Sequence, residues 1–149
     1  MYCVGWVDLS LGPVLFEIPD MGERYFVMPL IDAWTNTFKS IGSRTTGQLA
    51  QKYFLTLNTY SGEVPFGYTR INCPTSMVWI TGRIQCDIKK DALIVNELQG
   101  KYVLESYRAS LGEKDSLSLY QPKFKAIKVY KPVPFALAMN TEDFYNTFF

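Results

Sequence analysis

Hydrophobic residues in the first two thirds of the chain fall into short runs divided by turn-forming residues. Pro, Gly, Ser and Asp between the runs are typical of tight turns. The pattern favours a mainly β (α+β) fold, an antiparallel sheet or sandwich-like domain. The first three strands are expected to form a meander or consecutive hairpins. Strands are expected over residues 2–9, 14–18, 24–34, 52–57, 68–72 and 77–83, with a short extended piece over 102–107.

Two features interrupt this strand pattern. Pro29 cannot donate a hydrogen bond to a neighbouring strand, so it predicts a sheet edge or a bulge. Residues 35–51 lose the alternation and are rich in Ser, Thr and Gly. We interpret this segment as a long ordered loop, and such loops in compact domains are often functional.

Helical spacing of apolar residues is clear in one segment only, 87–100. Asp87 can cap its amino end and Gly100 can end it. One face, formed by Ile88, Ala92, Val95, Leu98 and Tyr102, is expected to pack on the sheet. A second, short helix is predicted near the carboxyl end, where Asn140 can cap and Asp143 occupies the third helical position.

The domain organisation follows from these elements. Residues 1–110 are expected to form a β-rich domain, 111–138 a linker or edge segment, and 139–149 the start of a truncated helix. Lysines alternate with apolar and aromatic residues over 123–131. We interpret that stretch as an edge strand guarded by lysines rather than as a nucleic-acid-binding strip.

Composition removes several classes of function. The 149 residues suffice for one domain, and a net charge of +1 argues against nucleic acid as a partner. No apolar run is long enough for a transmembrane helix. The chain has no histidine, which excludes Ser-His-Asp and Cys-His nucleophiles and histidine-ligated metals within it. Its three cysteines form no Cys-x-x-Cys pair, so no metal site and no cofactor are expected.

Polar side chains gather in and around the expected loop. Asp32 ends an apolar run, where a carboxylate should pair or function, and Arg44 is its expected partner. Gly42 and Gly47 would let the backbone turn tightly or approach a ligand closely. The network either orders the loop or binds a carbohydrate-like or anionic ligand. The candidate ligand-binding residues are Asp32, Asn36, Arg44, Thr45, Thr46 and Arg83, with Trp34 and Trp79 as an apolar wall.

Several motifs resemble one protein family. They are WVDLSLGP at 6–13, PDxGxRY at 19–25, DAWTNTF at 32–38, SIGSRTTG at 40–47, Pro74-Thr75 and WIxGR at 79–83. Over residues 2–107 the chain is similar to the N-terminal domain of the tandem family catalogued as domain of unknown function 1254. The resemblance implies a following jelly-roll domain and, as for many members of the family, export from a bacterial cell. As written, without a signal peptide before the first strand, the sequence predicts a cytoplasmic protein, whereas the resemblance predicts an exported one, so the localisation stays open.

Two hypotheses of function remain. The first is a non-catalytic binding or assembly module, associated with a cell envelope or particle and belonging to a truncated two-domain protein. Its partners would be the missing C-terminal domain or further copies in a homo-oligomer. The alternative is a carboxylate-dependent hydrolase of a carbohydrate-like substrate, because glycoside hydrolysis needs two carboxylates and no histidine. Asp32 would then work with Asp8, Asp20 or Glu17.

Overall fold

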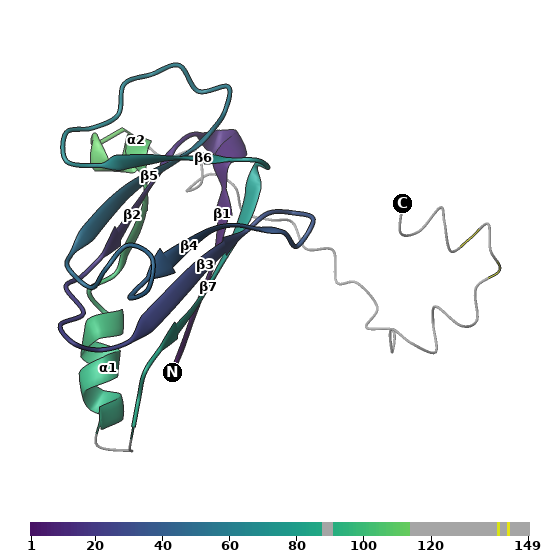
Figure 1. Cartoon of the computed structure of the whole chain (residues 1–149). Helices are drawn as coiled ribbons and strands as arrows, with labels where there is room; N and C mark the ends of the chain where they lie inside the picture. The colour runs from purple at the N-terminus through teal and green to yellow at the C-terminus, as the bar shows by residue number, and fades with distance from the viewer. Residues whose placement is uncertain (88–90, 114–139, 141–142, 144–149) are drawn as a thin grey trace. The chain divides into compact units, whose positions relative to one another are not determined.

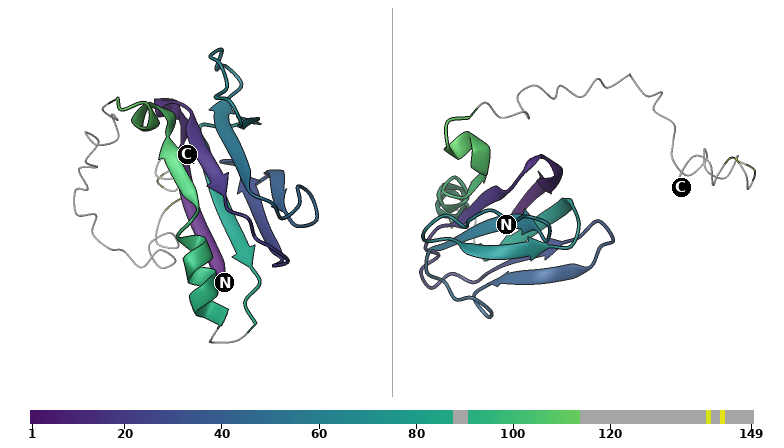
Figure 2. Two further views of the ribbon diagram at one scale, coloured as in Figure 1. Left: turned by 90° about the vertical axis from the view of Figure 1, so that its left-hand side faces the viewer. Right: turned by 90° about the horizontal axis from the view of Figure 1, so that it is seen from above.

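The computed structural model describes residues 1–87, 91–113, 140 and 143, and all elements below refer to these residues. Two four-stranded sheets lie one over the other (Figure 1, Figure 2). We call β1-β7-β3-β4 the first sheet and β6-β5-β2-β8 the second sheet. The strands are β1 (Tyr2–Asp8), β2 (Val14–Ile18), β3 (Phe26–Ile31), β4 (Thr37–Gly42), β5 (Gln51–Leu57), β6 (Thr69–Cys73), β7 (Met77–Ile84) and β8 (Val103–Ser106). A 3-10 turn, η1 (Leu9–Leu11), and two helices, α1 (Asp91–Gln99) and α2 (Tyr107–Ser110), complete the domain.

The core lies between the two sheets. On β3 every second side chain, from Phe26 through Met28 to Leu30, is fully buried because a strand turns alternate residues to opposite faces. Val14, Phe16 and Ile18 on β2 face them from the second sheet. The mainly β, sandwich-like fold expected from the alternation is therefore confirmed.

The expected order of strand pairing is wrong. β1, β2 and β3 do not form a meander, since consecutive strands alternate between the two sheets. The turns after β1 and β2 each lead the chain from one sheet to the other. The same turn-forming residues occur in such connections and in hairpins, so the sequence did not distinguish the two. β5 and β6 are parallel, because the loop between them, residues 58–68, is long enough to return the chain to the same end.

The expected loop over 35–51 contains a strand. β4 forms a hairpin with β3 and lies at the edge of the first sheet. Pro29 lies not at an edge but on an inner strand, at a position that would pair with Thr81 of β7. Pairing between β3 and β7 is interrupted there because proline lacks the N–H. The bulge lies instead between Leu30 and Ile31, on the side of β4.

Helix α1 presents the expected face to the core. Val95 is fully buried and Leu98 packs beside it. The helix begins at Asp91 after three residues outside the described part, which include Ile88, and it ends just before Gly100 as predicted. Within the described residues no helix is long and apolar enough to cross a membrane.

The predicted cap near the carboxyl end is present. The backbone N–H of Asp143 donates to Asn140 Oδ1 at 2.8 Å, which is the contact expected of an N-cap. The predictions for the rest of that helix, for the linker beyond residue 113 and for the lysine-rich stretch 123–131 fall outside the described residues.

Candidate functional site

Asp32 closes the β3–β4 hairpin. Its carboxylate accepts backbone N–H bonds from Trp34 and Asn36 at 2.9 and 2.8 Å and the Asn36 amide at 3.2 Å. Burial alone would raise the pKa of Asp32, but these three hydrogen bonds together hold it below its ordinary value. Thr35 takes the left-handed backbone conformation that the turn requires, with φ of 67°. Asp32 and Asn36 are therefore adjacent, as expected, and act on the turn itself.

Arg44 does not pair with Asp32, so that expectation is wrong. The two residues lie at opposite ends of the hairpin, roughly 20 Å apart for six strand residues. The Arg44 guanidinium lies over the ring of Tyr25, 5.3 Å from its centre. Beside it Thr45 and Thr46 fold over the carbonyl of Gly42, which accepts both of their backbone N–H groups. Strand β4, which lies within the segment expected to be a loop, separates Asp32 from Arg44.

The remaining predicted site residues lie on different elements. Arg83 is on β7 with its guanidinium 5.4 Å from the centre of the Tyr2 ring. Trp34 is on the hairpin turn and is 77% exposed. Trp79 is on β7, stacked on Trp6 with ring centres 5.5 Å apart. The polar cluster expected from the sequence is thus divided between the Asp32 turn, the Arg44 loop and the outer face of the first sheet.

Asp32→Ala is expected to lower the melting temperature, because two backbone N–H groups of the turn lose their acceptor. Since the pKa of Asp32 is lowered in the folded chain, this stabilisation is present above the ordinary pKa and is lost as the pH falls through the folded value. Thermal melts of the wild type and the variant should therefore differ at neutral pH and converge as the pH falls below the folded pKa of Asp32. Arg44→Ala is the control, and its effect should add to that of Asp32→Ala in the double variant. A coupled effect would contradict the separation of the two residues.

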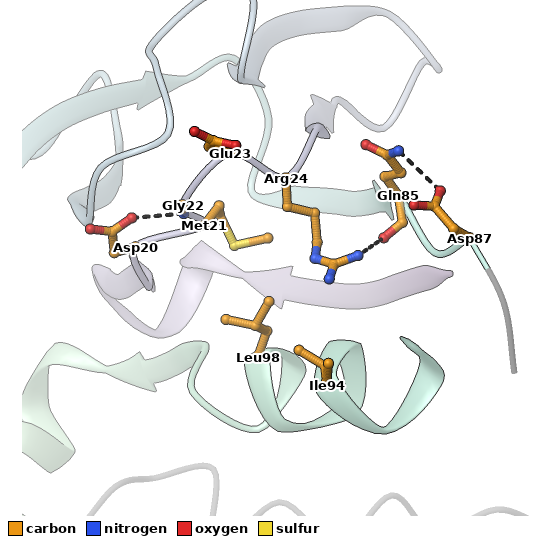
Figure 3. Close-up of a pocket in the computed structure, with 9 residues that line it drawn as sticks. All are labelled: Asp20, Met21, Gly22, Glu23, Arg24, Gln85, Asp87, Ile94 and Leu98. Carbon is orange, nitrogen blue, oxygen red and sulfur yellow. Dashed lines mark hydrogen bonds between the residues drawn. The ribbon is translucent and has the colours of Figure 1, made fainter. Parts of the chain in front are cut away.

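A polar pocket of about 490 Å³ lies beside α1. The turn between β2 and β3, the end of β7 and helix α1 form its walls, and Figure 3 shows Ile94 and Leu98 of the helix beneath the side chain of Arg24. The residues lining it are Asp20, Met21, Gly22, Glu23, Arg24, Gln85, Asp87, Ile94 and Leu98.

Arg24 spans this pocket and fastens α1 to the sandwich. Its two terminal nitrogens bind the two carboxylate oxygens of Asp91 at 2.7 Å, and one also donates to the Gln85 carbonyl at 2.8 Å. The hydrogen bond from Arg24 is the main reason that the pKa of Asp91 is below its ordinary value, and the bond from the Asp87 backbone N–H lowers it further. Such a two-pronged pair fixes geometry, and it leaves the guanidinium committed to a structural contact.

The carboxylates proposed for hydrolysis do not gather in one place. Asp20 accepts the Gly22 N–H at the pocket just described. Asp8 accepts the Ser10 N–H beyond the end of β1. Glu17 pairs with Lys52 at 3.0 Å and accepts the Tyr68 hydroxyl, which lowers the pKa of Glu17. In the described part of the chain, no group of three or more Cys, Asp or Glu residues could hold a metal ion.

The outer face of the first sheet is apolar and uncovered by described residues. Tyr2, Val4 and Trp6 of β1 are each 63–66% exposed, and β7 adds Met77 and Trp79. Antiparallel sheets normally turn polar side chains to water. Val27, Pro29, Ile31 and Thr81 are among the half-buried outward residues of this sheet. A hollow of about 220 Å³ is lined by Val27, Pro29, Thr81 and Arg83. We call Tyr2, Val4, Trp6, Val27, Pro29, Ile31, Met77, Trp79 and Thr81 together the bare face.

The outer face of the second sheet, in contrast, is covered around Phe54 by the 58–68 loop and α2. Phe54 points outward from β5 yet is fully buried, because Tyr60 of the 58–68 loop and Tyr107 of α2 pack their rings against it. Glu17, Lys52 and Tyr68 form a polar group nearby, and burial together with Glu17 raises the pKa of Tyr68 to about 12. The described residues thus cover the second sheet on its inner face and, around Phe54, on its outer face, but they cover the first sheet on its inner face only.

Sequence reasoning missed the Arg24 pocket and the bare face. The segment 19–25 that carries Asp20 and Arg24 stands out as a motif, but Asp91 lies 67 residues further along the chain. Large apolar residues alternate in the sequence of β1, at Tyr2, Val4 and Trp6. Alternation alone does not show whether that side of the strand is exposed or buried in the core.

Comparisons with known proteins assign the chain to a protein family. The model of the family described as Protein of unknown function (DUF1254) matches residues 1–106, and the chain belongs to that family. Among solved structures it is similar to the VPA0106 protein from Vibrio parahaemolyticus, with a TM-score of 0.72 and 25% identity over 77% of this chain. The match spans 29% of that protein's chain. No curated protein matches. The resemblance inferred from the motifs is confirmed.

Proposed function

We propose that this chain is a non-catalytic assembly module that docks through the bare face onto a second protein domain. The observation that carries the proposal is the contrast between the two outer faces. Phe54 on one face is buried by the chain itself, whereas Trp6 on the other is 64% exposed. A contiguous exposed apolar patch of this kind is typical of an interaction surface.

The chemistry of the bare face suits a protein partner. Tryptophan and tyrosine supply large contact areas and are enriched among the residues that dominate binding energy. The outward side chains of Arg83 and Asp8 lie at opposite ends of the face, and the members of the bare face carry no charge. An apolar, nearly neutral surface is therefore the expected complement, in contrast to a nucleic acid or an acidic surface.

The proposed occupant is a second domain. The VPA0106 chain is more than three times as long as the portion that resembles this chain, so a relative of this fold exists with much additional protein attached. The C-terminal domain implied by the family resemblance is the occupant to which we commit. Association with a cell envelope or a particle stays a prediction.

The dispersed carboxylates weigh against the hydrolase alternative. Glycoside hydrolysis requires two carboxyl groups facing each other across a cleft, about 5 to 9.5 Å apart. Asp32 is bonded into its own turn, and Asp8, Asp20 and Glu17 each bind groups on different elements. The predicted ligand pocket around Asp32, Asn36 and Arg44 loses its support for the same reason.

The test uses the C-terminal domain that this proposal expects to be encoded downstream, in the same reading frame or in the adjoining gene. Co-expressed with the chain, it should co-purify in a stoichiometric complex. Val4→Asp with Trp6→Asp should weaken binding by about tenfold or more, because charged groups then replace exposed apolar contacts. Circular dichroism would establish that the variant stays folded.

The matched control is Phe66→Asp, at a fully exposed aromatic residue in the 58–68 loop on the other side of the sandwich. It should leave the complex intact. The absence of a second domain from both positions in the genome would refute the proposal, as would a complex that tolerates the substitutions at Val4 and Trp6.

A further inference from the structure

Strand β1 leaves one side of its backbone open at the edge of the first sheet. Met1 and Ile84 exchange hydrogen bonds, and the Leu9 N–H donates to the Ser76 carbonyl. The register between these two points is regular, so the backbone groups of odd-numbered residues bond to β7 and those of even-numbered residues point away from it. The Tyr2 carbonyl accepts the Gln99 side chain at 2.8 Å. Among the described residues, no hydrogen bond reaches the backbone of Val4 or Trp6.

The β1 edge also lacks the usual protection. Natural sheets guard their edges with charged side chains, proline or very short strands. Each of the other three edge strands has at least one charged residue, namely Lys39 on β4, Arg70 on β6 and Glu105 on the four-residue β8. In β1, the first charged residue is Asp8, at its last position. Six successive uncharged residues therefore line an edge that can accept another strand.

Charge is distributed unevenly along this edge. On the outward face, Arg83 lies over the Tyr2 ring at one end of β1, and Asp8 lies at the other end. A second copy of β1 added antiparallel would reverse this order. The carboxylate of each copy would then come beside the Tyr2 ring and guanidinium of the other.

We propose that two copies of this chain pair through β1, antiparallel about a two-fold axis at Gly5. In this register Val4 lies opposite Trp6 of the second copy, and Tyr2 lies opposite Asp8 of the second copy. The central residues Cys3 to Val7 of β1 are paired, and the open N–H and C=O groups of Val4 and Trp6 form hydrogen bonds across the axis, while the Tyr2 carbonyl keeps its bond from Gln99. Strand addition of this type draws its affinity from the main chain.

The pairing makes one continuous eight-stranded sheet from the two first sheets. It uses the edge of β1 and leaves the outward side chains of the bare face uncovered, so it is independent of the docking proposed above. The dimer would carry two bare faces side by side. Two linked partner domains could then bind both faces at once, and binding of the first would raise the effective concentration of the second.

The first experiment removes a backbone donor from the edge. Val4→Pro deletes an N–H to which no described residue bonds, so the fold should be retained. Ser40→Pro is the matched control: Ser40 pairs with Pro29, and its N–H points outward from the guarded edge of β4. In sedimentation equilibrium the wild type and Ser40→Pro should be dimers at concentrations where Val4→Pro is a monomer. A wild type that stays monomeric, or a Val4→Pro dimer, would overturn the proposal.

The second experiment tests the register. Asp8→Lys and Arg83→Asp each place like charges at both contacts of a homodimer, so each should dimerise at least about tenfold more weakly than the wild type. Mixed in equal amounts they should recover dimerisation, because the heterodimer has opposite charges at both contacts. No recovery in the mixture would exclude the antiparallel register about Gly5, even if the chain dimerises in another way.

Discussion

Phe54→Ala is expected to lower the free energy of unfolding by about 3–5 kcal/mol, as truncation of a fully buried phenylalanine usually does. The side chain is on the outer face of the second sheet, where a residue of this size would ordinarily be exposed. The substitution is costly because Tyr60 and Tyr107 pack edge-on against the Phe54 ring, with their ring centres 5.6 and 5.1 Å from its centre. Urea denaturation should show a lower midpoint with an unchanged slope.

Trp6→Ala is the matched measurement on the opposite outer face. The indole is larger than the Phe54 ring, but it is mostly exposed and its principal contact is the stacked ring of Trp79. Its loss should cost about 1 kcal/mol, the value of an aromatic pair at a surface. The pair of variants therefore compares a covered face with a bare one. If Trp6→Ala is as costly as Phe54→Ala, the first sheet is already covered and the docking proposal fails.

Strand positions could be predicted closely from the sequence because alternation is a local property. β2 begins and ends where the pattern placed it, at Val14 and Ile18, and β7 differs by one residue. Strand partners could not be predicted in the same way. The residues after β1 and β2 specify a turn, and whether a turn leads back along the same sheet or across to the other depends on which faces both strands must bury.

The candidate site was mispredicted for a related reason. Residues 37–42 have the sequence TFKSIG, with little of the apolar content that marks a strand, because β4 lies at an edge and packs mainly through Ile41. A loop in place of this strand would bring Asp32 and Arg44 close enough to pair. The local relation between Asp32 and Asn36 was predicted correctly, since it depends on a few residues of sequence and not on the strand that follows.

The bare face was hidden in the sequence by the composition of β3. Phe26 to Ile31 are all apolar, so the strand reads as buried on both sides, and such runs are typical of strands covered by other elements. The structure buries Phe26, Met28 and Leu30 and leaves the other three half-exposed. The sequence of β3 is thus that of a strand with two covered faces, and the described residues supply only one cover. This mismatch between an entirely apolar strand and a half-exposed outer side supports a docked partner.

Gly42→Ala is expected to destabilise the domain by about 1–3 kcal/mol, the usual cost of forcing extra volume into a packed site. A methyl group at Gly42 would lie 2.5 Å from the Phe26 carbonyl oxygen and 2.9 Å from the Val27 Cα atom. Both are backbone atoms of β3, which is held between β4 and β7 and cannot shift without breaking a ladder. Gly42 is thus required for a close approach to the neighbouring strand, whereas the sequence predicted a tight turn or a close approach to a ligand.

Gly100→Ala provides the control for Gly42→Ala. At Gly100 the added methyl group would meet its nearest neighbours at 3.5 and 3.6 Å, which is ordinary contact, so the melting temperature should hardly change. At Gly42 the hairpin can relax only by opening from its Arg44 end. Native-state hydrogen exchange should then show faster exchange of the Ser43 and Thr45 amides, while the Asn36 amide, bonded to Asp32 at the other end, keeps its protection. Equal loss of protection at both ends would mean that the hairpin opens as one unit and that its two ends do not fold independently.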